Sequence, residues 1–171
     1  MQLTFTETRA ASFAASDTAR RWLAPGLAAG AGFLAIEMLA GSFTTSIWSF
    51  PESIAQTIGI GSPTRDLDPA QLLAGIVLHL AFSVCLGAMF VALAERFRVT
   101  GVKLLASAVL FMWAESAISI WLVLHTFFPA TLPVLLGAVP FWASFAGRTS
   151  FGVMLAIVYS HQAASSTTGQ P

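Results

Sequence analysis

Four ionisable side chains stand inside long apolar stretches of this chain. Glu37, Glu115 and Arg148 carry a formal charge, and His79 lies in a further stretch. A charge at the centre of a bilayer costs roughly 2.5–3.5 kcal/mol on insertion scales, so it is rarely left unpaired. Ionisable groups at that depth are typical of proton relays, ion pathways and substrate sites. The pattern therefore predicts one buried polar cluster to which four helices contribute.

Serines accompany these groups at helical spacing. Ser83 follows His79 by four residues, Ser119 follows Glu115 by four, and Ser144 precedes Arg148 by four, so each pair shares a helix face. The complete set of candidate site residues is Glu37, His79, Ser83, Glu115, Ser119, Ser144 and Arg148. Because Arg148 offers a planar fork of donors, we expect it to form an ion pair with Glu37 or Glu115.

Two interpretations of the cluster stay open. It could bind a proton, an ion or a substrate during transport or conduction, or it could be a structural clip that fixes the packing of the helices. A carboxylate–histidine metal site is disfavoured, because Ile118 stands where a paired Glu-x-x-His motif needs histidine, and because Arg148 repels a cation. No catalytic triad or phosphate-binding glycine loop has a credible spacing. We therefore expect no metal, no cofactor and no enzyme.

The composition predicts an integral membrane protein. The 171 residues are 56% hydrophobic and 9% charged, and the mean hydropathy is +0.78, which is outside the usual range of soluble domains. Eight basic residues balance eight acidic ones without forming a basic stripe, so nucleic-acid binding is not expected. The single cysteine, Cys85, has no disulfide partner, and we expect it to be a small buried residue.

Four windows are long enough to cross a bilayer, which takes about 20 apolar residues. They are residues 27–48, 71–93, 104–125 and 135–158. The expected fold is all-α, an antiparallel four-helix transmembrane bundle. Residues 22–160 would form one membrane domain in contact with the lipid bilayer, residues 1–21 a cytoplasmic tail and residues 161–171 a disordered cytoplasmic tail.

Basic residues outside the windows set the expected orientation. Six of the eight precede the first window or separate the second from the third, and Arg65 is the basic residue on the other side. The positive-inside rule then places both termini in the cytoplasm, as expected for a multi-pass protein of the inner (plasma) membrane. Because four short spans enclose little space, we expect a homo-oligomer or a place in a larger membrane complex.

The loops carry helix-start signals. Ser49 and Glu52 stand at capping-box spacing, which predicts a short interfacial helix in the first outer loop. Asp68 followed by Pro69 predicts the N-terminus of the second long helix. Small residues spaced by four, among them Gly26 with Gly30 and Ser83 with Gly87, predict close contacts between helices.

The chain resembles uncharacterised small four-helix inner-membrane proteins of bacteria. The resemblance rests on Trp48-x-x-Pro51-x-x-Ile54-Ala55, on Leu78-His79 and on the segment from Phe151-Gly152 to Tyr159, and it covers most of residues 25–160. Where such proteins often carry a histidine before the last Phe-Gly, this chain has Gly147-Arg148. The resemblance implies the fold and a bacterial inner-membrane location, and it implies no assigned activity.

Overall fold

The computed structural model covers residues 1–171 and describes residues 3–61, 67–127, 129, 133 and 137–167. Its described residues are helical or irregular, without strands. The elements are α1 (Leu3–Ser42), α2 (Ser49–Thr57), α3 (Pro69–Arg96), α4 (Gly101–Ala117), η1 (Ile118–Leu124), α5 (His125–Phe127) and α7 (Phe141–Thr167). Four of these helices are long and apolar enough to cross a membrane, in the segments Ala19–Ser42, Pro69–Arg96, Gly101–Ile120 and Phe141–Ala164. Length and composition are therefore those of a multi-pass membrane protein.

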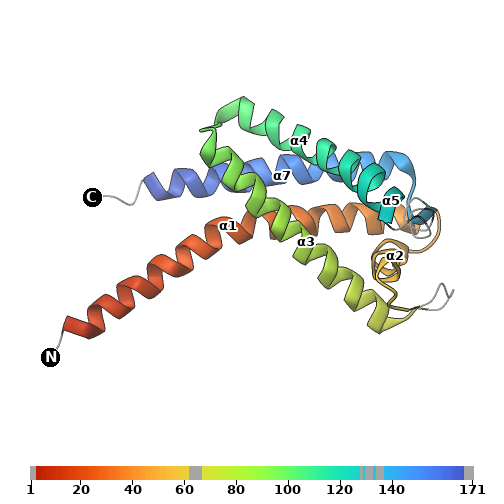
Figure 1. The fold of residues 1–171 in the computed structure, drawn as a ribbon, viewed down its shortest axis with the longest axis horizontal. Coiled ribbons are helices and arrows are strands. Elements are labelled where there is room, and N and C mark those ends of the chain that lie inside the picture. The colour runs from red at the N-terminus through yellow and green to blue at the C-terminus, as the bar shows by residue number, and fades with distance from the viewer. Residues whose placement is uncertain (1–2, 62–66, 128, 130–132, 134–136, 168–171) are drawn as a thin grey trace.

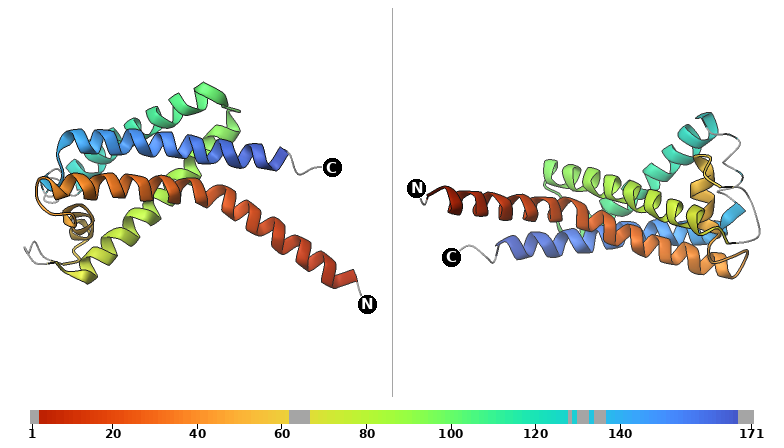
Figure 2. Two further views of the ribbon diagram at one scale, coloured as in Figure 1. Left: turned by 180° about the vertical axis from the view of Figure 1, so that it is seen from behind. Right: turned by 90° about the horizontal axis from the view of Figure 1, so that it is seen from below.

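Helices α1 and α7 lie side by side and carry the other two long helices (Figure 1). Helix α3 packs on α1, and α4 packs on α7, whereas α3 and α4 diverge from the turn that joins them (Figures 1 and 2). Both termini lie at the end of the molecule that holds this turn, and α2 lies at the opposite end. We call these the turn end and the α2 end.

The contact between α1 and α3 depends on facing glycines, as the spacing of small residues predicts. A Cβ atom added to Gly26 would lie 2.5 Å from the carbonyl oxygen of Ser83 and 2.8 Å from the Cα atom of Val84. Gly87 faces Gly26 directly, and Gly30 meets the Ser83 side chain. The two backbones are therefore close enough for dispersion contacts, which is the attraction that remains between helices surrounded by lipid.

Helix α1 is longer than the predicted span at one end and shorter at the other. It extends through the segment predicted as a polar tail and ends at Ser42, six residues before the predicted end. Pro25 lies inside it and has no N–H to donate to the preceding turn, and α1 bends in this region (Figure 2). Gly41, Thr44 and Thr45 then take part in turn hydrogen bonds, which explains why the helix stops early.

Helix α2 is present, but the predicted capping box is wrong. The position before α2 is Trp48, which makes no side-chain cap. The Ser49 hydroxyl instead donates to the carbonyl oxygens of Ser46 at 2.7 Å and of Ala138 at 3.0 Å. The bond to Ala138 ties α2 to the segment before α7.

The start of α3 confirms its predicted cap. Asp68 accepts hydrogen bonds from the N–H groups of Ala70 at 3.0 Å and Gln71 at 3.2 Å, and Pro69 occupies the first turn. The buried Gln71 side chain donates to the carbonyl oxygen of Glu52 at 3.1 Å. This bond fixes α2 against α3.

Two departures concern the third and fourth helices. The α-helical turns of α4 give way to a π-helix, η1, at Ile118–Leu124, within the predicted window. A π-turn holds more residues than the 3.6 of an α-turn, so the side chains after Ile118 lose their register with those before it. Helix α7 begins after Pro140, because Pro140 lacks an N–H and its carbonyl caps Ala143 and Ser144. Arg65, residues 135–136 of the fourth window, and residues 168–171 lie outside the described residues.

Two smaller expectations also differ from the structure. Helix α7 continues to Thr167, into the segment predicted to be disordered, since Gln162, Ala163 and Ala164 are good helix formers. Cys85 is exposed on α3 rather than buried. Its small apolar side chain suits a face directed to lipid as well as it suits a core.

The turn between α3 and α4, residues 97–100, holds an arginine where glycine is usual. The N–H of Val99 donates to the carbonyl oxygen of Ala94 at 3.0 Å, and the N–H of Arg98 donates to that of Glu95 at 3.2 Å. This is a Schellman-type helix end. Arg98 has φ +53°, a left-handed conformation that costs roughly 1–2 kcal/mol for a residue with a Cβ atom.

Candidate functional site

Glu37 is the most deeply buried charged residue of the candidate site. Its side chain on α1 is 0% exposed and faces α7. A Cβ atom added to Gly147 would lie 3.0 Å from Glu37 Oε1, so the absence of a side chain there provides the space for the carboxyl group. Within the described residues, neither carboxyl oxygen has a hydrogen-bond partner. Leaving a buried acceptor unpaired costs about 1–3 kcal/mol, and more for a charged one.

Ser144 and Arg148 lie on either side of Gly147 on α7. The Ser144 hydroxyl approaches the Glu37 carboxyl group without reaching hydrogen-bond geometry. The Arg148 guanidinium donates to the carbonyl oxygen of Ser144 at 3.2 Å, and its central carbon lies 6.0 Å from the centre of the Phe33 ring. A cation over an aromatic face at this distance is attracted by the ring quadrupole.

The predicted ion pair of Arg148 does not form in this structure. Its guanidinium interacts electrostatically with the carboxylates of Glu115 and Glu37. Among the described residues, however, the ion pair within 4.0 Å joins Arg21 to Glu95, far along the chain from this site. Arg148 is instead held by a carbonyl of its own helix, and its charge acts on the two carboxylates at longer range.

Glu115 occupies a more open position on α4. Its carboxylate accepts a hydrogen bond from the Ser119 hydroxyl. Both residues line a groove of about 280 Å³ between α3 and α4, whose other walls include Phe82, Leu86 and Phe111. Glu115 therefore has Arg148 on the interior side and an apolar groove on the other.

His79 and Ser83 form a separate group between α1 and α3. The His79 ring stacks on Phe33 with centroids 5.2 Å apart, and its Nε2 atom lies 3.0 Å from the carbonyl oxygen of Gly30. A carbonyl only accepts, so Nε2 carries a proton in this arrangement. The Ser83 hydroxyl donates to the His79 carbonyl at 2.7 Å. His79 is thus satisfied by α1 and contacts no carboxylate in the described part of the chain.

Phe33 divides the single cluster that the sequence predicts. On one side of the Phe33 ring lies the carboxylate layer, which we define as Glu37, Glu115, Ser119, Ser144 and Arg148. On the other side lies the histidine group, which consists of His79 and Ser83. Phe33 contacts His79 and Arg148, and the Cβ atom of a residue at 147 would meet its ring at 3.1 Å. The spacing of residues along one helix predicts which side chains share a face of that helix. It does not predict that an apolar ring from a neighbouring helix lies between two such faces.

The carboxylate layer lies closer to the α2 end than the predicted windows imply. Glu37 is five residues before the end of α1, and Arg148 is seven residues after the start of α7. At 1.5 Å per residue these offsets are roughly 7 and 10 Å. The two groups share a level, because α1 and α7 lie side by side, but this level is not the middle of either helix.

The donor set of the layer does not resemble a metal centre. Within the described residues, no three His, Cys, Asp or Glu side chains gather around one point. Neither the groove beside Glu115 nor the larger pocket at the turn end is lined by Glu37. Ionisable side chains inside long apolar helices are typical of proton relays and ion pathways.

No known protein family, curated protein or solved structure matches this chain. The resemblance to small four-helix membrane proteins therefore stays a prediction from the sequence.

Proposed function

We propose that the protein is a multi-pass membrane protein, an antiparallel four-helix bundle, in which the carboxylate layer binds a proton or ion during coupled transport or conduction. The observation that carries this proposal is the Glu37 carboxyl group, fully buried and without a hydrogen-bond partner in the described residues. A charged carboxylate in that setting needs a proton, a cation or a moving donor to offset its desolvation.

The surroundings of Glu37 supply such a donor. Arg148 holds a carbonyl oxygen one turn away on α7 and interacts with both carboxylates at longer range. A change of its side-chain rotamer would move the guanidinium from this carbonyl toward Glu37 or Glu115. Proton or ion binding at either carboxylate would then compete with Arg148, which is how a site can alternate between loaded and empty states.

A second function, that of an accessory subunit, is favoured by a different observation. Helices α3 and α4 diverge, and the groove between them holds the half-buried Glu115 and Ser119 among apolar residues. A transmembrane helix from a second copy or from a larger complex would fill this groove, and the carboxylate layer would then fix the register of the packing.

In the proposed orientation the chain spans the inner membrane, and both of its termini lie in the cytoplasm. It is supported by the basic residues near the turn between α3 and α4. Arg96, Arg98 and Lys103 flank this turn in the sequence, and Arg21, which follows Arg20, pairs with Glu95 beside it. Cysteines introduced at Ser62 and Thr100, in a chain with Cys85 replaced by alanine, test it. A membrane-impermeant thiol reagent applied to intact cells should label the first and not the second, and the reverse pattern would reject this orientation.

Proton flux into proteoliposomes tests the transport function. The purified chain should collapse an imposed pH gradient faster than empty vesicles do. Glu37→Gln should reduce the rate to that of empty vesicles, because the amide keeps the shape of the carboxyl group and does not titrate. Glu95→Gln, which removes a carboxylate at the turn end, is the matched control and should retain the flux. Helix content measured by circular dichroism shows whether each variant folds.

The same preparation distinguishes the accessory role. If the well-folded wild-type chain moves no protons, sodium or potassium above the empty-vesicle rate, the transport proposal is wrong. Cross-linking through cysteines placed at Phe82 and Phe111 should then capture a neighbouring helix in the groove.

A further inference from the structure

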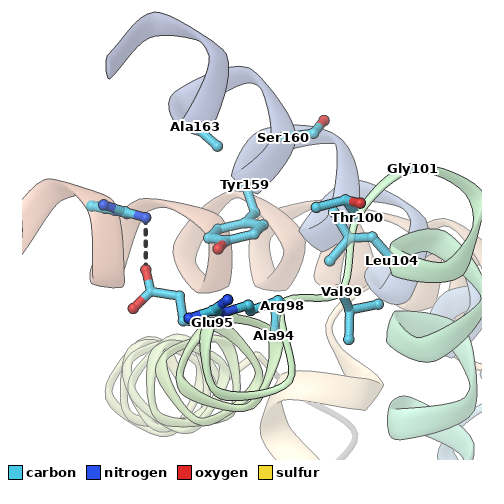
Figure 3. A pocket seen from close by; sticks show the side chains of 11 residues that line it. Ala94, Glu95, Arg98, Val99, Thr100, Gly101, Leu104, Tyr159, Ser160 and Ala163 are labelled. Atoms are coloured by element: carbon cyan, nitrogen blue, oxygen red, sulfur yellow. Dashed lines mark ion pairs between the residues drawn. The ribbon is translucent and has the colours of Figure 1, made fainter. Parts of the chain in front are cut away.

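A pocket of about 520 Å³ opens at the turn end, apart from the carboxylate layer (Figure 3). Residues from α1, α3, α4 and α7 line it. Its walls are apolar at Ala94, Val99, Leu104 and Ala163, and polar groups stand around them. A site that combines an apolar wall with a polar rim suits an amphiphilic ligand.

Tyr159 is the buried polar group of this pocket. The residue is 7% exposed, and it lines the pocket. Figure 3 shows the hydroxyl turned toward Glu95 and Arg98 within the pocket. A tyrosine hydroxyl that faces a pocket is positioned to donate a hydrogen bond to a bound molecule.

The charges around the pocket favour an anion. Glu95 would oppose one, but Arg21 lies 2.8 Å from its carboxylate and offsets its charge. Arg98 forms no ion pair within 4.0 Å among the described residues, and it leaves the pocket with an excess positive charge. The left-handed turn conformation of Arg98 holds this arginine at the rim.

The first turn of α4 adds hydrogen-bond donors beside Arg98. The preceding residue, Thr100, lines the pocket and makes no side-chain cap, so no side-chain oxygen of Thr100 occupies the free N–H groups of this turn. These N–H groups and the positive end of the helix dipole favour an anionic group near Thr100.

We propose that this turn pocket binds the phosphate group of an anionic membrane lipid. Arg98, the first turn of α4 and the Tyr159 hydroxyl would donate to the phosphate oxygens. The apolar walls favour a lipid over a free anion, because Val99 and Leu104 can contact the glycerol and upper acyl region. Basic pockets at the ends of transmembrane helices are typical sites for anionic headgroups. The inference depends on the membrane location in the proposed function and not on transport.

Retention of lipid by the purified full-length chain tests this proposal. The chain is mixed with equal amounts of phosphatidylglycerol and phosphatidylcholine in detergent, and the lipids that remain bound are counted by native mass spectrometry. We expect phosphatidylglycerol to be retained preferentially. Arg98→Gln should weaken its binding about tenfold, as expected for the loss of one charge-assisted hydrogen bond, and Tyr159→Phe should weaken it by a smaller factor.

Arg96→Gln is the matched control. Arg96 lies two residues before Arg98 and carries the same charge, but its side chain does not line the pocket. Equal retention of the two lipids, or an equal loss in Arg96→Gln and Arg98→Gln, would overturn the proposal. Competition by inorganic phosphate at the same concentration as the lipid would assign the site to a soluble phosphate and would reject a lipid as its ligand. A chain that conducts no protons but retains phosphatidylglycerol through Arg98 would reject the transport function and support this inference.

Discussion

Replacing Gly26 by alanine should separate α1 from α3 and destabilise the protein. The added Cβ atom would lie 2.5 Å from the Ser83 carbonyl oxygen and 2.8 Å from the Val84 Cα atom, whereas non-bonded carbon atoms prefer about 3.5–4.0 Å. Both neighbours are backbone atoms, so a change of side-chain rotamer cannot relieve the overlap. The helices must move apart by about 1 Å, and a gap of this size forfeits a quarter to a half of each dispersion contact.

The net effect follows from two opposing contributions. Overpacking costs about 1–3 kcal/mol, and we take the upper part of this range because backbone is involved. Alanine also returns about 1 kcal/mol of helix propensity relative to glycine. We therefore expect the free energy of unfolding to fall by about 1–2 kcal/mol.

Unfolding of the detergent-solubilised chain in mixed micelles with increasing dodecyl sulfate measures this change. Gly137→Ala is the matched control, because a Cβ atom there would meet nothing within 4 Å. If Gly26→Ala unfolds within about 0.5 kcal/mol of Gly137→Ala, the close contact between α1 and α3 is not what holds these helices together.

Three further substitutions test the site and the α2 end. Arg148→Met should lower the free energy of unfolding by about 1–3 kcal/mol, the cost of one hydrogen bond, and a loss of 3–5 kcal/mol would instead reveal a dry ion pair. Gly147→Ala should slow proton flux in proteoliposomes, because its Cβ atom would lie 3.0 Å from Glu37 Oε1, and unchanged flux would argue against Glu37 as the carrier. Burial raises the pKa of the Glu52 carboxyl group from 4.5. The negative charge of Asp68 raises this pKa further, whereas the backbone N–H of Asp68 lowers it. The folded state then binds this proton more tightly than the unfolded chain, so thermal stability should fall as pH rises above 4.5, and a melting series of Glu52→Gln should lack this decline.

The sequence predicts the long helices because their signals are local. Apolar runs of about 20 residues reveal the spans, and the Asp68-Pro69 pair marks the start of α3 to the residue. The small-residue pairs of Gly26 and of Gly87 predict that each helix makes a close contact, but they do not predict that these two glycines face each other. The capping box at Ser49 fails because a carbonyl group from residue 138, distant in sequence, competes for its hydroxyl.

The parts of the site that could not be predicted depend on contacts between helices. Phe33 reads as an ordinary apolar residue of the first span, and only the packing of α1 against α3 and α7 places its ring between His79 and Arg148. The position of Glu37 near the α2 end depends on where α1 stops. The polar run Thr44-Thr45-Ser46 follows that point, but the predicted window extended past it to Trp48. The turn pocket is assembled from four helices, and Arg98 alone, in a short basic turn, is the sequence signal that points to it.

The ring of Phe33 contacts both the histidine group and the carboxylate layer, so it offers a mechanical route of communication between them. It stacks on His79 and lies under Arg148, so a shift of one neighbour displaces the ring against the other. Coupling transmitted by such a displacement is allosteric in the thermodynamic sense and acts equally in both directions. It should be insensitive to ionic strength, unlike a direct attraction between charges, and it should disappear when a smaller aliphatic side chain replaces the ring.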